Sequence, residues 1–599
     1  MIAISSIRHA LSSRARSTFR RAPAVALRTS WYGIRDAARS SPGWLGTAAT
    51  LNLLHAVIPA AQIWSLERLV NELVTPVGPP SELILDVLIL TVTVGLNYPL
   101  GQVALIASQR MGLRMTLRYK SQLAQAAARL RPRQLADAQI STTLQDAQLA
   151  IDPMSRVPGN ALQLAAAMVT AAALCVAICS FSPPAGLIVF SALLPTVAAF
   201  TVIARAEADG WPRVAAAQRR VGYAMEQLVQ QRPATELALL GSGSRVAGLV
   251  IKSERDKLRE LDRLIAIAMR WELAASAVTA VLLAGALTSM IIDNVGAAFA
   301  AAAIAGILSG LSAIRFTGYA FGNIVSAAPR AAALYGVDDL APVRQWAPAP
   351  PRTRRIDVIG LTVRYPDSTR PAVEDVDLHA ERGEIIALVG ANGAGKTSTV
   401  NALLRVTEIE QGKIIIDDHD AETLSEPELL QRFGMLTQEF GRYEFTVRDV
   451  VSLGTADSEV GDEAIWRAVT AAEAAGFVRE LPAGLDTQLG QQWGGTGLSG
   501  GQWQRLALAR IHLRDAGIWI LDEPTSAIDA EAEREIFSSL QRSRQDRITI
   551  VVSHRAWTLR GMDRIYVFDH GRIVQVGSFH QLLDQPGRFA DLFAEQLDR

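Results

Sequence analysis

The segment GANGAGKT, residues 390–397, is a glycine-rich loop that ends in a lysine and a threonine. It fits the spacing G-x-x-x-x-G-K-[ST], follows the apolar run EIIALVG and precedes the helical run TSTVNALLRV, which is the context that a phosphate-binding loop requires. Its glycines let backbone N–H groups surround a β-phosphate, Lys396 can reach the β- and γ-oxygens, and the Thr397 hydroxyl suits Mg²⁺. The segment predicts a nucleoside triphosphate site; a chance glycine loop is the alternative.

Two acidic residues follow the apolar run IWIL, residues 518–521. A carboxylate at the end of a buried strand beside a phosphate loop can hold the water shell of Mg²⁺, and a second one can polarise the attacking water. We therefore expect Asp522 to serve the magnesium ion and Glu523 to act as the general base. His554, at the end of VVSH, could bond the γ-phosphate or hold the water. Taken alone, His554 and Gln438 in MLTQEFGRYEF would also fit ordinary structural positions.

A second glycine-rich segment, GLSGGQWQRLALAR, covers residues 497–510. Ser499, Gly500 and Gly501 could present backbone N–H groups to an anion at the start of a helix. The simpler interpretation is a capping box, S-x-x-Q, formed by Ser499 and Gln502. The two interpretations are compatible, because a cap and an anion site use the same exposed N–H groups.

The composition divides the chain into two kinds of sequence. Hydrophobic residues make up 49% of its 599 residues, charged residues 20%, and the mean hydropathy is +0.19, which is typical of a chain that is part membrane and part aqueous. The 59 basic and 59 acidic residues cancel, so no global basic surface favours nucleic acid as a partner. Cys175 and Cys179 lie in an apolar run and are predicted to be packed helix residues rather than a disulfide, a metal site or a nucleophile.

Apolar stretches of about 20 residues, enough to span about 30 Å of hydrocarbon, occur only in the first 325 residues. We expect six spans, at about residues 44–66, 83–107, 160–182, 184–205, 271–292 and 294–320. The connections 108–159 and 206–270 are long, charged and helical in pattern, and the first is crowded with arginines. The positive-inside rule places these connections and both termini in the cytoplasm.

The first 35 residues contain seven arginines and no acidic residue. Such a start resembles a mitochondrial transit peptide, but it also suits a cytoplasmic segment on the anionic inner face of a bacterial membrane, which we favour. A proline-rich stretch around residues 341–355 marks a domain boundary. The expected organisation is listed in order: 1–43, a basic cytoplasmic segment; 44–335, a helical six-span membrane domain; 336–355, a linker; 356–599, an α/β nucleotide domain.

Several polar residues fall within the expected spans, among them His55, Glu272 and Arg315. They could line a substrate cavity, which is the usual position of an intramembrane charge. They could equally lie at interfacial depth or bond to a neighbouring helix. The sequence does not choose between these interpretations.

The order GANGAGKT, LTQEF, LSGGQ, WILDEPTSAID and VVSH resembles the ATP-binding cassette family over residues 356–599. Six spans before such a cassette, with long loops after the second and fourth, resemble its exporter-type half-transporters. The resemblance therefore covers nearly the whole chain. It implies an α-helical membrane domain followed by a P-loop NTPase domain that hydrolyses ATP with Mg²⁺.

The resemblance also assigns roles by matching position. It makes Tyr365 the adenine-stacking residue, Gln438 the Q-loop residue that senses magnesium and the membrane domain, Asp529 the D-loop aspartate and His554 the switch histidine. The catalytic set is then Glu523, His554 and Gln438, and the magnesium set is Thr397, Gln438 and Asp522. The nucleotide set comprises Tyr365, Gly390, Asn392, Gly393, Ala394, Gly395, Lys396, Thr397, Ser398, Ser499, Gly500, Gly501, Gln502 and Asp529. Gln491 departs from the family, where exporters often have glutamate, and this puts details of contact with the membrane domain in doubt.

In this family two cassettes pack head to tail, and each ATP lies between the phosphate loop of one and the LSGGQ segment of the other. One chain supplies one membrane half and one cassette, so the resemblance implies two chains. Because every catalytic motif is intact, we expect a homodimer rather than a heterodimer. ATP closes the dimer and hydrolysis resets it, with coupling segments expected near residues 143–153 and 228–240.

The predicted function is ATP-driven export across the bacterial inner membrane by alternating access. The segments QEFGRYEFTVRDVVSLG and LSGGQWQR are similar to those of exporters of modified peptides such as lanthipeptides, so a peptide or other amphipathic compound is the expected cargo. Lipid or drug export is the first alternative. An importer on the same scaffold, as in siderophore uptake, is the second. A cassette ATPase that acts on nucleic acid or as a sensor fits six spans poorly.

Overall fold

The computed structural model describes residues 22–597, apart from 75–79, 181, 294–296, 341–351, 367, 458, 524–529 and 543. The chain divides into a helical unit, Met1–Arg131 with Asp137–Pro342, and an α/β unit, Pro132–Ala136 with Val343–Arg599. The division after Pro342 falls inside the stretch 336–355 that the sequence analysis treats as a linker.

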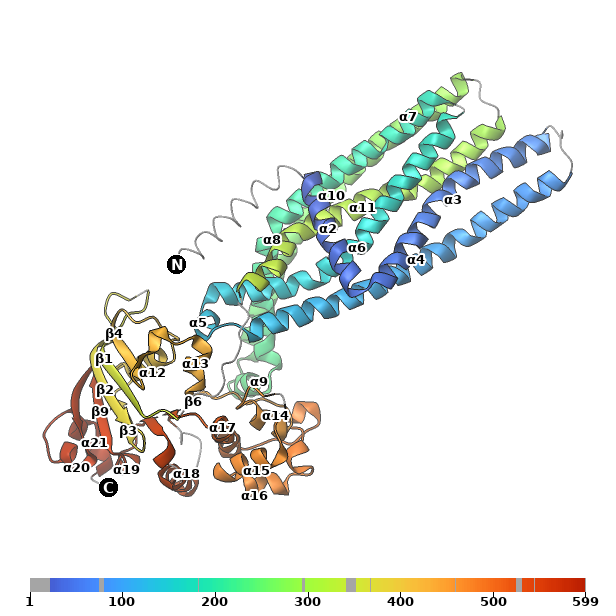
Figure 1. The fold of residues 1–599 in the computed structure, drawn as a ribbon. Helices are drawn as coiled ribbons and strands as arrows, with labels where there is room; N and C mark the ends of the chain where they lie inside the picture. Colours follow the sequence, from blue (N-terminus) through green and yellow to red (C-terminus); the bar gives the residue numbers. More distant parts are fainter. Residues whose placement is uncertain are drawn as a thin grey trace. The chain divides into compact units, whose positions relative to one another are not determined.

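Most helices of the helical unit are long and run side by side (Figure 1). They are α2 (Ala22–Ser40), α3 (Pro42–Val74), α4 (Pro80–Ala128), α6 (Ala138–Cys179), α7 (Pro183–Ser191), α8 (Leu193–Val229), α9 (Gln231–Leu239), α10 (Gly243–Ile292) and α11 (Ala297–Leu340). The charged connections 108–159 and 206–270 are helical, as predicted, because α4, α6, α8 and α10 extend the apolar segments without a break.

Five segments of the described residues are long and apolar enough to cross a membrane: Pro42–Leu73, Ile84–Ala128, Ala138–Cys179, Pro183–Val229 and Gly243–Ile292. Each contains most of one expected span. The sixth expected span, 294–320, falls largely on α11, but residues 294–296 and the side chains of 297–302 and 305–317, Arg315 included, lie outside the described part. Of the other polar residues, His55 faces α4, where a Cβ on Gly101 would lie 3.4 Å from its Nε2 atom, and Glu272 is exposed.

Local sequence explains where the helices of this unit begin and break. Ser182 caps α7, accepting a hydrogen bond from the Ala185 N–H, and prolines follow it in the first turn. Gly186 lets α7 approach α6 closely, since a Cβ there would lie 2.2 Å from the Cys179 Sγ atom. Cys175 and Cys179 are free thiols on α6, with sulfur atoms 3.7 Å apart, as expected of packed helix residues.

The basic N-terminal segment is partly folded into the helical unit. On α2, Asp36 is 3% exposed and its Oδ2 atom accepts hydrogen bonds from Tyr335 of α11 at 2.7 Å and Tyr119 of α4 at 3.3 Å. The Arg35 guanidinium lies 3.4 Å from the same carboxylate. Residues 1–21, which hold most of the arginines, lie outside the described residues. The described part of the segment therefore packs into the helical unit, because α2 joins α4 to α11 through a buried carboxylate.

We predict that Tyr335→Phe destabilises the helical unit by about 1–3 kcal/mol, because it leaves a buried carboxylate short of one donor. Thermal unfolding of the purified full chain in detergent measures the effect. Tyr98→Phe on α4, where the side chain is 74% exposed, is the matched control and should leave the Tm unchanged. Equal Tm values for the two variants would contradict the assigned role of Asp36.

The α/β unit contains two sheets. A four-stranded antiparallel sheet has the order β2-β1-β4-β5, and a six-stranded sheet has the order β10-β9-β3-β8-β7-β6. The strands are β1 (Arg355–Val363), β2 (Val373–Glu381), β3 (Ile385–Gly390), β4 (Gln411–Ile416), β5 (His419–Asp420), β6 (Phe433–Leu436), β7 (Ile518–Asp522), β8 (Ile548–Val552), β9 (Arg564–Asp569) and β10 (Arg572–Gly577). Five apolar runs predict buried strands or hairpins, namely IIALVG, GKIIID, GIWILDE, RITIVVSH and RIYVFDHGRIVQVG, and the structure confirms them as β3, β4, β7, β8 and the β9–β10 pair.

The larger sheet places the functional motifs at one edge. Strands β9, β3, β8, β7 and β6 are parallel neighbours, and every residue of β3, β7 and β8 is buried, as continuous apolar runs predict for a sheet covered on both faces. Parallel strands end at the same edge, so the residues that follow β3, β8, β7 and β6 meet there. These are the phosphate loop, His554, Glu523 and Gln438.

Helices cover this sheet and form a second core beside it. They include α12 (Lys396–Leu403), α13 (Glu426–Gln431), α14 (Val447–Ser452), α15 (Asp462–Ala471), α16 (Ala475–Glu480), α17 (Gly500–Arg514), α18 (Ala530–Arg542), α19 (Ala556–Leu559), α20 (Phe579–Leu583) and α21 (Arg588–Leu597). Figure 1 shows α14, α15, α16 and α17 grouped together. The second core contains Trp503 and Leu506 of α17 and continues to Trp519 of β7, so α17 is anchored to the sheet.

His512 on α17 is a buried titratable residue of this core. Its ring meets Trp519 edge to face, with centroids 4.7 Å apart, and the Arg547 guanidinium lies 3.9 Å from the Trp519 centroid. Burial, reinforced by the Arg547 charge, lowers the pKa of His512 from 6.5 to about 4. His512 therefore stays neutral in the folded protein at pH values where an unfolded histidine is charged.

We predict that acidification from pH 7.5 to pH 5 destabilises the α/β unit through His512. The unfolded residue takes up a proton below about pH 6.5 while the folded one does not, so the free energy of unfolding is unaffected above pH 6.5 and falls by about 2 kcal/mol at pH 5. Thermal unfolding of the full chain at both pH values is the measurement. His512→Phe, which keeps a planar ring against Trp519, should lose less Tm on acidification than the parent chain; an equal loss would refute the assignment.

Candidate nucleotide site

The loop between β3 and α12 has room only for glycine at two close approaches. Gly390 has a φ of 150°, and a Cβ there would lie 2.4 Å from the carbonyl oxygen of Phe568 on β9. Gly395 has a φ of 107°, and a Cβ there would lie 2.7 Å from the carbonyl oxygen of Ala372. The loop is thus pressed against β9 and the start of β2, with the first turn of α12 directly behind it. Its N–H groups and the α12 N-terminus form an arrangement suited to an anion.

Lys396 begins α12 and is only 5% exposed. Its Nζ atom donates to the carbonyl oxygens of Gly390 at 2.8 Å and Ala391 at 3.0 Å, so the side chain folds back along the loop. Burial lowers the pKa of Lys396, and the nearby Asp522 and Glu523 charges oppose this shift. A buried ammonium group held by two neutral carbonyls gains strongly from a phosphate group.

Glu523 lies at the centre of a cluster drawn from three strand ends. Its Oε2 atom accepts a hydrogen bond from Gln438 Nε2 at 3.0 Å, and its Oε1 atom lies 3.4 Å from His554 Nε2. The three residues follow β7, β6 and β8. The structure therefore brings together the three residues that the sequence analysis assigns to catalysis, although 85 positions separate Gln438 from Glu523.

The backbone of Glu523 is strained. Its φ is 47°, in the left-handed region that non-glycine residues seldom occupy. Its N–H donates to the Val552 carbonyl oxygen of β8 at 3.0 Å, which ties the turn to the neighbouring strand. Backbone strain of this kind costs of the order of 1–3 kcal/mol and is concentrated at functional sites. Here it turns the carboxylate out of the line of β7 and toward Gln438 and His554.

The charges of the site are set by burial and by one another. Burial and the Glu523 charge raise the pKa of Asp522, and Lys396 opposes them. Burial and the Lys396 charge lower the pKa of His554, with Glu523 opposing. His554 is therefore neutral at pH 7, and its ring can donate one hydrogen bond and accept another. The site holds two neighbouring carboxylates near one ammonium group, an arrangement that a cation and a polyphosphate would complete.

The donor set fits a magnesium ion. Mg²⁺ takes oxygen ligands, keeps several waters and is usually bound through one or two protein groups together with substrate phosphates. Asp522 supplies a carboxylate and Thr397 an exposed hydroxyl. Gln438 uses its Nε2 atom toward Glu523, which leaves its amide oxygen to face an ion. These residues would hold Mg²⁺, which would neutralise phosphate charge there.

Tyr365 lies on the segment that follows β1, beside the start of α12. It is 38% exposed, and its hydroxyl oxygen lies 3.2 Å from Ser398 Oγ. An aromatic ring held next to the phosphate loop presents a face to which a nucleotide base can stack. The resemblance assigns Tyr365 the same role.

The LSGGQ segment forms the start of α17. Ser499 is the N-cap: its Oγ atom accepts from the Gln502 N–H at 3.3 Å, and the Gln502 Oε1 atom accepts from the Ser499 N–H at 2.9 Å. The predicted capping box is confirmed. Among the described residues, no hydrogen bond or ion pair joins this segment to the phosphate loop. Asp529, the predicted D-loop residue, lies outside the described residues.

Sequence reasoning missed the residues that hold the loop in place. Ala372 and Phe568 contact the loop through backbone oxygens, and Val552 fixes the Glu523 turn in the same way. Backbone oxygens act whatever the side chain is. No residue type could therefore have revealed these positions.

Comparisons with known proteins agree with this geometry. Residues 373–526 match the family described as ABC transporter. An ATP-dependent lipid A-core flippase of Methylobacillus flagellatus is 40% identical over 236 residues, 39% of this chain and 40% of that protein. A flippase of the same name from Ralstonia nicotianae is 42% identical over 233 residues, 39% of each chain. The beta-(1→2)glucan export ATP-binding/permease protein NdvA of Agrobacterium vitis is 40% identical over 225 residues, 38% of each chain.

The matched region thus spans about two fifths of the length of these curated relatives. The structure, by contrast, is similar over nearly its full length to that of a bacterial Atm1-family ABC exporter with ATP bound, with a TM-score of 0.78 and 20% identity, covering 92% of this chain and 98% of the other. At that identity the likeness defines the fold. Residues 373–526 therefore match the ABC transporter family, and the chain has the same fold as that bacterial exporter.

Proposed function

We propose that this protein uses ATP hydrolysis to export a lipid-like, amphipathic molecule across a bacterial inner membrane. The observation that carries the proposal is Glu523, held by Gln438 and His554 at the strand edge that also bears Lys396 and Asp522, in a chain that also has apolar helices of membrane-spanning length. A hydrolytic site combined with such helices has a direct use in transport. Both termini and the α/β unit would then lie in the cytoplasm.

Each residue of the cluster has a step that it can perform. Glu523 takes the proton of the attacking water, Gln438 and His554 orient that carboxylate, and Lys396 transfers its hydrogen bonds from the loop carbonyls to phosphate oxygens. Glycine N–H groups of residues 390–395 bind the β-phosphate, and Tyr365 stacks on adenine. Mg²⁺, when bound, supplies neutralisation of the phosphate charge through Thr397, Gln438 and Asp522.

The site of one chain is proposed to be completed by a second copy. Ser499, Gly500, Gly501 and Gln502 would address the γ-phosphate held by the partner, and Asp529 would lie at the same junction. In support of this, no hydrogen bond among the described residues joins the LSGGQ segment to the phosphate loop of its own chain. A homodimer gives two equivalent sites.

The relatives favour a lipid over a peptide as cargo. Two of them are named as lipid A-core flippases and one as a glucan exporter, whereas the peptide interpretation depends on short segments of the α/β unit that take part in ATP chemistry. The proposal therefore takes the lipid alternative. Export and import remain distinguishable only by the direction of movement.

Coupling between ATP and the helices is proposed to use two short helices. The expected segment 143–153 lies inside the continuous helix α6, but α5 (Pro132–Leu135), ten residues earlier, belongs to the α/β unit, where Arg133 pairs with Glu408. The second expected segment, 228–240, coincides with α9. We therefore move the first proposed coupling segment from residues 143–153 to α5.

Reconstitution into liposomes tests the proposed function. We expect lipid A-type glycolipids to stimulate the ATPase activity of the full chain, and fluorescent glycolipid to move toward the leaflet opposite the α/β unit. Stimulation by lanthipeptide-like peptides alone would restore the peptide interpretation. Movement toward the α/β unit would show an importer, and an ATPase without any movement would refute transport.

A further inference from the structure

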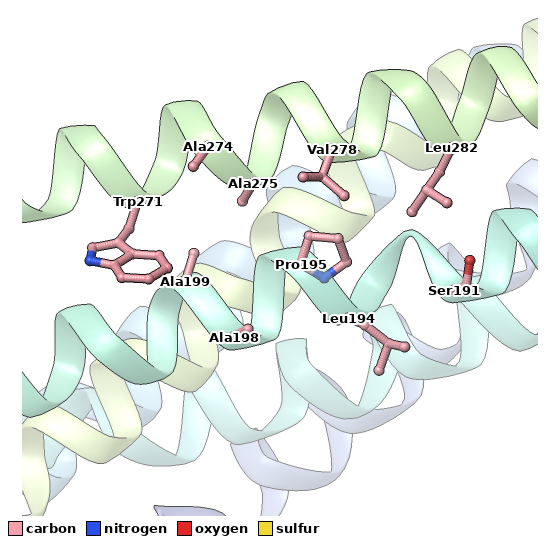
Figure 2. A pocket seen from close by; sticks show the side chains of 10 residues that line it. All are labelled: Ser191, Leu194, Pro195, Ala198, Ala199, Trp271, Ala274, Ala275, Val278 and Leu282. Carbon is pink, nitrogen blue, oxygen red and sulfur yellow. The ribbon is translucent and has the colours of Figure 1, made fainter.

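The helical unit contains a groove between α10 and the α7–α8 pair, far along the helices from α9. Its volume is about 550 Å³, which is within the range of small-molecule sites. Figure 2 shows Trp271, Val278 and Leu282 of α10 pointing toward α8 across a row of alanines. Of its lining side chains only Ser191 and Trp271 carry a polar atom. The groove therefore suits hydrocarbon.

The packing of the two helices explains why the groove exists. Beyond the Trp271 end of the groove, α8 and α10 approach closely. A Cβ on Gly210 would lie 3.2 Å from Glu260 Oε1, and Arg213 Nε donates to that same oxygen at 3.0 Å. Along the groove the helices face each other through Ala198 and Ala274, whose side chains are too short to fill the space. The groove is thus left open along the alanines, whereas farther along the same two helices Gly210 and the Arg213–Glu260 ion pair hold them close together.

Helix length places the groove in one leaflet of a bilayer. Asp293, at the end of α10, accepts a hydrogen bond from Ser182 at 2.5 Å, and Trp271 precedes it by 22 residues. That separation is about 33 Å of helix, close to the hydrocarbon thickness of about 30 Å. With Asp293 at one interface, Trp271 lies at the other, the level at which tryptophan is enriched. From Trp271 to Leu282 the groove extends for about 17 Å, the depth of one leaflet.

A cation lies beyond the Trp271 end of the groove. Arg205 follows Ala198 by seven residues, so the two lie on the same face of α8. Its side chain is exposed, and within the described part of the helical unit no ion pair engages it. Arg213 and Glu260 pair with each other, and the acidic Asp209 lies one turn farther from the groove. On α10 the exposed Arg270 and Glu272 flank Trp271, and on α8 Arg205 is the charged residue nearest to the groove.

We propose that this groove binds one acyl chain of an anionic phospholipid from the leaflet on the Trp271 side, and that Arg205 contacts its phosphate. The apolar wall matches the chain, the length matches one leaflet, and a guanidinium matches a phosphate in charge and geometry. This lipid is a resident of the membrane rather than the cargo. The proposal therefore does not depend on the export function.

Photocross-linking of the full chain in nanodiscs tests the proposal. The probe is phosphatidylglycerol with a diazirine on one acyl chain, and the adducts are located by peptide mass spectrometry. We expect adducts concentrated on residues 191–199 and 271–282. The double variant Ala198→Phe/Ala274→Phe fills the groove and should lower this labelling at least about fivefold. Ala280→Phe, half a turn around α10 on an exposed face, is the matched control and should leave it unchanged.

A separate variant tests the proposed contact between Arg205 and the lipid headgroup. Arg205→Gln should lower phosphatidylglycerol labelling about fivefold, and should lower that of a phosphatidylcholine probe less. Arg220→Gln, the same change about 22 Å farther along α8, should have no effect. If the Ala198→Phe/Ala274→Phe variant does not fold, the adduct map of the parent chain and the labelling of Arg205→Gln still test the proposed lipid site.

Two results would overturn the proposal. Adducts spread evenly around α8 and α10 would mean that only the general lipid shell is sampled. Absence of groove adducts, together with a disulfide between two copies of an Ala274→Cys variant, would mean that a second chain covers the groove. Either result leaves ATP hydrolysis and transport untouched, so it is distinguishable from failure of the proposed function.

Discussion

Glu523→Gln is expected to bind ATP normally and to hydrolyse it at least about 100-fold more slowly, because positioned general bases contribute about 10²–10⁴-fold to rate. The substitution is close to isosteric. The new amide oxygen can still accept from Gln438 Nε2, which now donates to Glu523 at 3.0 Å. What is lost is the negative charge that takes the proton of water. The measurements are kcat for phosphate release and the Kd for ATP of the reconstituted chain.

The control is Glu463→Gln on α15, whose side chain is 89% exposed. It makes the same chemical change in the same unit and should retain full kcat. If Glu523→Gln turned over ATP at the parent rate, Glu523 would not be the base. If it lost ATP binding as well, the strained turn at Glu523, rather than proton transfer, would be the origin of the defect.

Mixing two inactive variants is expected to restore ATPase activity. Lys396→Ala disables the phosphate-loop half of the shared site, and Ser499→Arg blocks the LSGGQ half. In a head-to-tail dimer of one copy of each, one site carries both defects and the other carries neither. Random pairing then gives about a quarter of the parent activity, since half of the dimers are mixed and one of their two sites is intact.

The measurement is the ATPase rate of the two variants co-reconstituted, compared with each alone. The control is a mixture of the Lys396→Ala and Lys396→Thr variants, because no pairing of these two chains contains an intact phosphate loop. Restoration in the first mixture and none in the second supports a shared site. Full activity of a single Ser499→Arg chain at concentrations where it is monomeric would refute it.

Motifs with a local cause could be predicted from the sequence. The phosphate loop is recognisable because its glycines are required by backbone approaches of 2.4 Å and 2.7 Å, and the buried strands are recognisable because both faces demand apolar residues. The Ser499 capping box follows from two residues three positions apart. In each case the signal is a short run of residues, even where the contact that requires it, such as that of Gly390 with Phe568, is with a distant part of the chain.

Features with a long-range cause could not be predicted. The bond between Gln438 and Glu523 depends on strand order, which no local pattern encodes. The expected coupling segment 143–153 was placed at the middle of a loop, but α6 continues through Pro153 and Pro158, so the segment lies within a helix and its coupling role stays a prediction. Asp36 shows the same limit: an arginine-rich segment gave no sign that its first acidic residue would be buried against two tyrosines from distant helices.

The cargo is poorly encoded for a physical reason. The sequence matches to relatives cover about two fifths of their length, and segments such as LSGGQWQR are proposed to contact ATP rather than the transported molecule. A membrane cavity can be built from many apolar sequences, whereas a phosphate loop tolerates few. Sequence similarity therefore identifies the nucleotide-binding unit more reliably than the transported molecule.

The capping box at the start of α17 has a consequence for how the two chains of the proposed dimer would separate. The Ser499 and Gln502 N–H groups are already satisfied within their own chain, so withdrawal of a partner's phosphate leaves these two donors no worse off. In the proposed dimer, contact with the γ-phosphate would exchange these neutral hydrogen bonds for charge-assisted ones, which are about twice as strong. Once the γ-phosphate has gone, the capped N–H groups keep their partners within the chain, so the proposed interface would open without leaving these donors unpaired.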